Sequence, residues 1–267
     1  MSKQNPFDQK KNAILQEINS IGPDLSPKGT IDRLCIPIID LINKSPDMVT
    51  TSSCSGRISV FIEGTKAIDG DIKVGGKGEG GKWLFVSHEL DEVDNWFQRV
   101  TEKEQITWEV DADSIEVYPD GSSRMILYKY EPFILHVKCR DFETASRLYN
   151  TAMSCGFRES GIGSNFIVAI RINIKLDVPI GYVDENKGTL KLICNPDYIK
   201  VLDIMTKAKF SENSKKMDQL YGKIESEMIL KVNEVSKKEN HTESKEARRE
   251  RKRREGLEKQ RMMKEQT

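Results

Sequence analysis

The sequence has no long apolar run and no excess of charge of either sign. No stretch of its 267 residues approaches the roughly 18 consecutive apolar residues that a membrane-spanning helix needs. Residues 1–15 also lack the apolar core of a secretory signal peptide. Lysine plus arginine number 42, as do aspartate plus glutamate, so whole-chain charge does not indicate a nucleic-acid-binding protein. These absences predict a soluble protein that does not enter a membrane.

Cysteine is scarce and irregularly spaced. The chain has five cysteines, an odd number, and no pair has the C-x-x-C spacing of a redox or zinc motif. No group of histidine, cysteine and aspartate residues has the spacing of a zinc site. We therefore expect a reducing, cytoplasmic location and no structural metal.

What is present is enough for a packed core, because 37% of the residues are hydrophobic. Apolar periodicity and Gly/Pro punctuation predict helices over residues 6–18, 30–43, 89–103, 141–155 and 195–235. β-rich runs predict strands over residues 57–62, 82–88, 105–110, 124–130, 133–139, 165–173 and 189–194. Strands and helices without a repeated βαβ rhythm predict an α+β fold.

The C-terminal part of the chain differs from the rest. Apolar periodicity fades there, and residues 245–267 hold ten lysine or arginine residues against five glutamates. We expect a functional domain over residues 1–210 and a charged, helix-prone, partly disordered tail over 211–267. Two interpretations of the basic run remain open: neutralisation of nucleic-acid phosphates, or a solvated helix without a role in catalysis.

The segment TTSSCSGRI, residues 50–58, places small hydroxyls, a thiol and a guanidinium between two β-like halves. We expect a tight turn whose backbone amides and hydroxyls, together with the planar fork of Arg57, bind an anion. The alternative is a serine-rich turn with a surface arginine. Cys54 as a nucleophile would need a neighbouring base, and the sequence shows none.

Two histidines lie in strands. Alternation along residues 82–88 places Trp83 and Ser87 on one face and His88 on the other, where the strand meets a loop. That position favours a functional imidazole, and a hydrogen-bonded structural histidine is the alternative. Trp83 is expected in the core. His136 shares a strand face with Ile134 and is expected to be a buried, hydrogen-bonded histidine.

Six segments in a fixed order carry a family resemblance. They are DLSPKGTID (24–32), TTSSCSGRI (50–58), KWLFVSH (82–88), YEPFILHVKCRDFETA (130–145), GFRESGI (156–162) and IVAIRINIKLDVPIG (167–181). With these segments the chain resembles the tRNA wybutosine-synthesizing protein 3 family. The resemblance covers about residues 24–181 and does not reach the tail.

The resemblance implies an activity and a fold. The activity is S-adenosylmethionine-dependent N4-methylation of 7-(3-amino-3-carboxypropyl)-4-demethylwyosine in phenylalanine tRNA, by a monomeric enzyme. The fold is a compact two-layer α+β sandwich and not a Rossmann-type methyltransferase. The sequence agrees, since no strand is followed by an Asp/Glu-x-Gly-x-Gly loop.

The implied chemistry assigns roles to the motif residues. The methyl donor and the tricyclic base of the tRNA both carry an amino-acid zwitterion. Each therefore offers a carboxylate that the segment ending in Arg57 could bind. We expect the methyl donor to be bound by Ser53, Ser55, Gly56, Arg57 and Ser87.

Two residues are candidates for the base that accepts the nitrogen proton. His88 is preferred, because an ordinary histidine has a pKa of about 6.5, and Asp177 is the second candidate. Two other classes of function remain: a non-catalytic RNA-binding module and a cysteine-dependent hydrolase that uses Cys54.

Overall fold

The computed structural model describes residues 5–20, 29–65, 80–109, 119–120, 122–230, 249–250 and 252–254. The chain divides into two compact units, residues 1–223 and 224–267. In the second unit the structure describes a short π-helix, Glu225–Leu230, and helical residues near 250. None of the helices described has the length and apolar character needed to cross a membrane.

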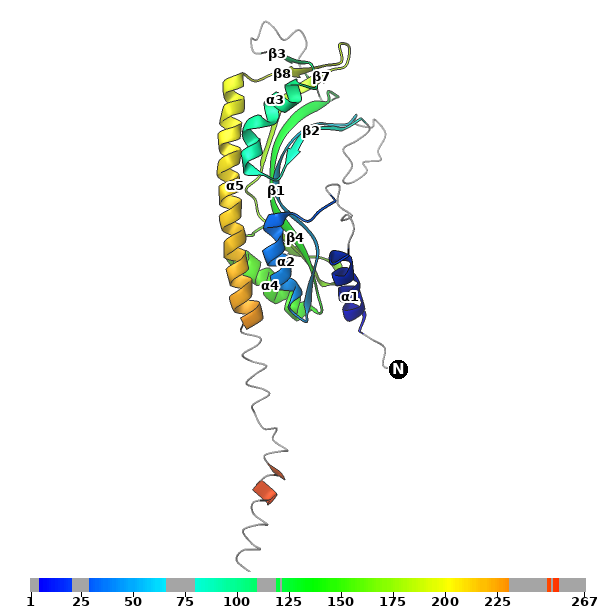
Figure 1. The fold of residues 1–267 in the computed structure, drawn as a ribbon, viewed down its shortest axis with the longest axis vertical. Coiled ribbons are helices and arrows are strands. Elements are labelled where there is room, and N and C mark those ends of the chain that lie inside the picture. The colour runs from blue at the N-terminus through cyan, green and yellow to red at the C-terminus, as the bar shows by residue number, and fades with distance from the viewer. Residues whose placement is uncertain are drawn as a thin grey trace, which may run out of the picture. The chain divides into compact units, whose positions relative to one another are not determined.

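The first unit is built on one mixed sheet of eight strands (Figure 1). The main path runs β2-β1-β4-β7-β8-β3, while β6 pairs with β4 and β5 pairs with β6. The strands are β1 (Met48–Ile62), β2 (Lys82–Ser87), β3 (Ile106–Trp108), β4 (Met125–Cys139), β5 (Gly161–Ile162), β6 (Ile167–Arg171), β7 (Leu176–Asp184) and β8 (Thr189–Leu192). Among the strands that the structure describes, only β3 and β8 pair in parallel, and the other pairs are antiparallel, which differs from a doubly wound parallel sheet.

Five α-helices and three 3₁₀ turns accompany the sheet in the first unit as described. They are α1 (Pro6–Ile18), η1 (Arg33–Cys35), α2 (Ile36–Asn43), η2 (Leu90–Asn95), α3 (Trp96–Thr101), α4 (Phe142–Ser154), η4 (Ser164–Phe166) and α5 (Pro196–Ile224). Figure 1 shows α5 along one side of β1 and β4, with α1 on the other side. Residues of α3 and α5 join the inner side chains of β1, β2 and β4 in one hydrophobic core. The predicted α+β sandwich is confirmed.

Local signals placed several helices correctly. Asp141 caps α4 by accepting a hydrogen bond from the Thr144 amide at 2.8 Å, and Gly156 ends that helix with φ of 91°. Phe142, the first residue of α4, is 61% exposed, although Ala145 and Leu148 on the same helix are fully buried. The helix expected over residues 30–43 begins only at Ile36, because Pro37 has no amide hydrogen and fits the first turn.

The expected tight turn at residues 50–58 is wrong. These residues lie within β1, which pairs with β4 from Met48 to Ile62. The two separate strands expected over residues 124–130 and 133–139 are likewise one strand, β4. Small polar residues are common in turns, but here the cross-strand ladder provides their backbone partners and keeps the chain extended.

Helix α5 continues past residue 210, where we placed the end of the functional domain. Its buried residues in this part include Asn213, Met217 and Leu220, which are 2%, 7% and 0% exposed. The functional boundary at residue 210 stays a prediction, but the first compact unit extends to Lys223.

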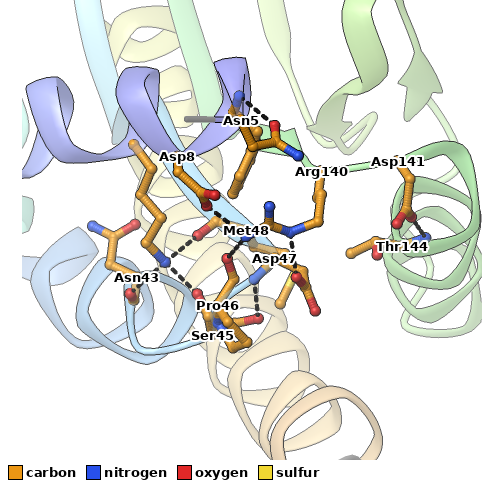
Figure 2. A network of polar contacts seen from close by, with 12 residues as sticks. Asn5, Asp8, Asn43, Ser45, Pro46, Asp47, Met48, Arg140, Asp141 and Thr144 are labelled. Carbon is orange, nitrogen blue, oxygen red and sulfur yellow. Dashed lines mark hydrogen bonds and ion pairs between the residues drawn. The ribbon is translucent and has the colours of Figure 1, made fainter. Parts of the chain in front are cut away.

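A polar network attaches α1 to the sheet (Figure 2). The Arg140 guanidinium donates to Asp47 Oδ1 at 2.6 Å and to Asp8 Oδ1 at 2.7 Å, and it lies 4.7 Å from the Phe7 ring centroid. Lys11 Nζ donates to the backbone carbonyls of Asn43, Ser45 and Met48. The hydrogen bond from Arg140 lowers the pKa of Asp8. That contribution to stability is present above the ordinary Asp pKa of about 3.9 and is lost as the pH falls further.

Arg140→Met should lower the free energy of unfolding by about 1–3 kcal/mol, because charged hydrogen bonds to two carboxylates are lost while the apolar stem is kept. Chemical denaturation of the purified chain measures this. Lys200→Met is the matched control, since the exposed Lys200 forms its ion pair with the exposed Asp197 on α5 and its replacement should change stability little. Equal losses in the two variants would contradict a specific role for Arg140.

Candidate active site

The site is centred on a break in the β1–β4 ladder at Ser55 and Phe133, directly beside the pair Gly56 and Pro132. Gly56 and Pro132 face each other across the strands. Gly56 has φ of +99°, a conformation that favours glycine, and Pro132 has no amide hydrogen to donate. The alternation of buried and less buried residues in β4 shifts by one residue here. Even-numbered residues are buried from Ile126 to Tyr130, and odd-numbered residues are buried from Phe133 to Cys139.

Side chains from outside the ladder bind the backbone groups beside this break. Ser55 and Phe133 would be the next facing pair, but the cross-strand pairing omits Ser55. Instead, the Asn213 amide of α5 accepts a hydrogen bond from Phe133 N at 2.8 Å and donates to Ser55 O at 2.8 Å. The Ser55 amide donates to Asp32 Oδ2 at 2.8 Å. One buried side chain on each side therefore holds the Ser55 backbone in place.

Asp32 contacts both Ser55 at the ladder break and His88. Asp32 lies just before η1, and its Oδ2 atom is 3.6 Å from His88 Nε2. The side chains of Asp32 and His88 are 8% and 16% exposed. The distance exceeds a normal hydrogen bond, and such contacts in unliganded sites often tighten when substrate binds. The arrangement can orient the imidazole and stabilise its positive charge after it accepts a proton.

Cys54 is the third member of this group. One ligand atom each of Asp32, Cys54 and His88 lies within 4.8 Å of the other two. Burial raises the pKa of the Cys54 thiol, so the thiol is protonated at neutral pH and is a poor nucleophile. Mixed oxygen, sulfur and nitrogen ligands can also hold a metal ion; the absence of a structural metal stays a prediction.

Ser87 positions the turn that carries His88. Its hydroxyl donates to Glu92 and accepts a hydrogen bond from the Glu89 amide at 3.0 Å. The side chain is 5% exposed. Its expected contact with the methyl donor stays a prediction.

Arg57 and Trp83 lie together on the outer face of the sheet, the face opposite the core formed with α5. Arg57 Nε donates to Glu131 Oε2 at 2.6 Å, and the guanidinium lies 5.4 Å from the Trp83 ring centroid. Trp83 stacks on Phe61 with a centroid distance of 5.3 Å, so its expected place in the core is wrong. The cause is an extra residue in β2: Val60 pairs with Phe85 and Phe61 with Trp83, which leaves Leu84 unpaired and packed against the core.

The remaining expected site residues divide into two groups. Ser53 is half-buried on β1, whereas Ser55 and Gly56 are buried, so the last two could bind a ligand only after a local movement. Asp177 forms an ion pair with Lys129 at 2.8 Å on β7. Because β1 and β4 lie between β2 and β7, Asp177 is about 14 Å from β2 across the sheet. The structure therefore does not bring Asp177 beside His88.

His136 is hydrogen-bonded as expected but only half-buried. Its Nδ1 atom lies 2.7 Å from Ser52 Oγ. Burial and the nearby charge of Arg171 lower its pKa, so the imidazole is neutral at pH 7.

Two residues of the site, Asp32 and Asn213, are not among those expected from the sequence. Asp32 lies in the first of the motif segments, directly before an apolar run, and a buried carboxylate in such a place is a signal for function. Asn213 gives no such signal, because it is one of many polar residues in a helical stretch assigned to the tail.

Comparisons with known proteins agree with the motif order. A family model described as Methyltransferase TYW3 matches residues 9–226. The chain is 62% identical over 267 residues to tRNA wybutosine-synthesizing protein 3 of Saccharomyces cerevisiae, covering 99% of this chain and 98% of that protein. It is 40% identical over 222 residues to the Schizosaccharomyces pombe protein of the same name, covering 82% and 86%. The PH1069 protein structure from Pyrococcus horikoshii matches with a TM-score of 0.61 at 25% identity, over 84% of this chain and 95% of that chain.

Proposed function

Because this chain belongs to the Methyltransferase TYW3 family, we propose that it methylates N4 of 7-(3-amino-3-carboxypropyl)-4-demethylwyosine in phenylalanine tRNA, with S-adenosylmethionine as donor. The observation that carries the site assignment is the Asp32–His88 pair beside the opened ladder at Ser55. Family membership disfavours a non-catalytic RNA-binding module. The raised pKa of Cys54 disfavours the cysteine-dependent hydrolase.

The residues of the outer face suit the methyl donor and the modified tRNA base, because both carry a carboxylate. S-adenosylmethionine, when bound, supplies a methyl group on a sulfonium. Arg57 is one-third exposed and is held by Glu131, which fixes its planar fork for a carboxylate. The half-buried Ser53 pairs with the buried Leu135, so its hydroxyl would reach the donor only after a local movement of β1. The main role of the site residues is to align the reacting nitrogen with the methyl group and to exclude water.

His88 is the proposed proton acceptor. The nitrogen lone pair would form the new carbon–nitrogen bond while the methyl–sulfur bond breaks and its electron pair stays on the departing thioether. The proton on that nitrogen must then leave. With Nε2 facing Asp32, the imidazole would carry its hydrogen on Nε2 and accept the substrate proton at Nδ1. Asp32 would stabilise the resulting positive charge, as a carboxylate does for a histidine base in other enzymes.

Direct assay tests the proposed activity. The purified full chain is incubated with S-adenosylmethionine and phenylalanine tRNA carrying the demethylated precursor, and the nucleosides are analysed by mass spectrometry. We expect the mass of that nucleoside to rise by one methyl group. An unchanged nucleoside mass with folded protein that binds both reactants would overturn the proposal.

Cys54→Ser should retain a single-turnover rate within a few-fold of the wild type. The buried thiol is protonated at neutral pH, and alkyl transfer from a sulfonium needs no thiolate. Serine also keeps the size of the side chain beside Asp32 and His88. A folded Cys54→Ser protein without activity would favour covalent chemistry at this residue.

A further inference from the structure

Four residues outside the proposed catalytic group lie along β4, β6 and the turn before β6. We call His136, Lys138, Phe166 and Arg171 the β4–β6 strip. His136 and Lys138 alternate in β4 with the buried Leu135 and Val137, so both point to the outer face of the sheet. Arg171 ends β6 and pairs with Ile134, which in turn pairs with Cys54. The strip is therefore continuous with the candidate active site across neighbouring strands.

Hydrogen bonds connect the strip to the motif segment of β1. Arg171 Nη2 lies 3.3 Å from His136 Nε2, and His136 Nδ1 lies 2.7 Å from Ser52 Oγ. A neutral imidazole accepts from Arg171 at Nε2 and donates to Ser52 at Nδ1, in agreement with its lowered pKa. The Arg171 guanidinium is thus held in place by a partner that does not neutralise its charge.

The two cations of the strip have no carboxylate partner within 4.0 Å among the residues that the structure describes. Lys138 Nζ donates to a carbonyl, Asn165 O, at 3.1 Å. Elsewhere on the outer face, Arg57 and Lys129 are paired with Glu131 and Asp177. Lys138 and Arg171 therefore differ from Arg57 and Lys129 in that no carboxylate of the described residues neutralises their charge.

Phe166 is held in a strained conformation while it remains accessible. Asn165 and Phe166 have φ of 56° and 58°, in the left-handed region that residues other than glycine rarely adopt. Phe166 is nevertheless 41% exposed, so burial of its ring compensates for the strain only in part. The turn is closed by a hydrogen bond of 2.7 Å from Gly163 N to Ile167 O. Strain of this kind is concentrated at binding sites and active sites.

An exposed aromatic ring with cations beside it on a sheet is the arrangement that binds unpaired nucleotides. Bases stack on the ring, and lysine or arginine contacts the phosphates. We propose that the β4–β6 strip binds the tRNA strand next to the methylated nucleotide, with Phe166 stacking on one base and Lys138 and Arg171 contacting phosphates. This inference rests on the proposed function for the identity of the RNA.

Equilibrium binding of the full chain to an unmodified phenylalanine tRNA transcript tests the strip without requiring catalysis. The double variant Lys138→Ala/Arg171→Ala should bind at least tenfold more weakly at moderate salt. The slope of log affinity against log salt should fall in magnitude by about 1 to 2, because two phosphate contacts are lost. Lys215→Ala is the matched control: Lys215 is exposed on α5, and its loss should change neither affinity nor slope.

Phe166→Gly separates binding from stability. Glycine adopts a positive φ without strain, so the thermal midpoint should stay the same or rise. Affinity for the transcript should nevertheless fall about tenfold with an unchanged salt slope, because stacking is lost and no charge is removed. Binding of S-adenosylmethionine should not change in any of these variants.

The outcomes distinguish the strip from the proposed function. If the wild-type chain binds the transcript and the strip variants bind it equally well, the strip does not bind tRNA, and the proposed function is unaffected. If the wild-type chain binds no tRNA, both are overturned. If the strip variants bind weakly and the wild-type chain transfers no methyl group to the precursor, the tRNA-binding role of the strip is supported and the proposed reaction is overturned.

Discussion

Replacing His88 by glutamine is expected to slow the methyl-transfer step about a hundredfold or more, with donor affinity changed only a few-fold. Glutamine keeps a polar side chain near Asp32 but cannot accept a proton at neutral pH. Because His88 is only 16% exposed, solvent has poor access to replace it as the base. Single-turnover measurements at saturating tRNA and donor separate this step from binding and product release.

Three further variants define the role of His88. Asp32→Asn removes the charge beside His88 and leaves an oxygen that can accept from the Ser55 amide, so it should slow the step at least tenfold and preserve folding. His136→Gln and Asp177→Asn should leave the saturated single-turnover rate near that of the wild type. A His88→Gln rate near the wild type would contradict its assignment, and a large loss in Asp177→Asn would transfer the role to Asp177.

Local sequence signals predicted much of the fold. The capping aspartate and terminal glycine of α4, and the apolar period of α1, act within a few residues, so they are readable without the tertiary structure. The position of His88 at the end of β2 was predicted for the same reason. The strand Leu176–Asp184 was not predicted, because Pro179 and Gly181 lie within it and both residue types usually interrupt strands.

The site itself depends on contacts between distant segments. Trp83 was misplaced because one extra residue in β2 reverses the alternation, and a single sequence does not show where a bulge falls. The segment around Cys54 was taken for a turn because its residue types suit turns, whereas its conformation is set by pairing with β4. The meeting of Asp32, Cys54 and His88 follows only from how η1, β1 and the end of β2 pack together.

Asn213→Ala should lower both stability and the rate of methyl transfer. The Asn213 amide bridges Phe133 N and Ser55 O across the opened ladder, and it is 2% exposed. Its removal leaves two buried backbone groups without their partner, which should cost about 2–4 kcal/mol in the free energy of unfolding. The Ser55 backbone would then be held from one side only, by Asp32. Because the same carboxylate faces His88, the saturated single-turnover rate should fall at least tenfold.

Thr206→Val is the control that separates positioning from stability. Thr206 is also on α5 and fully buried, and its hydroxyl accepts a hydrogen bond from Tyr128 OH at 2.9 Å, away from the ladder break. The variant should lose stability and keep the wild-type rate at temperatures where it remains folded. Asn213→Ala should stay slow at temperatures where it is folded to the same extent as Thr206→Val. If the two variants slow the reaction equally at equal folded fractions, Asn213 acts only through stability, and the bridge between α5 and the Ser55 backbone has no part in catalysis.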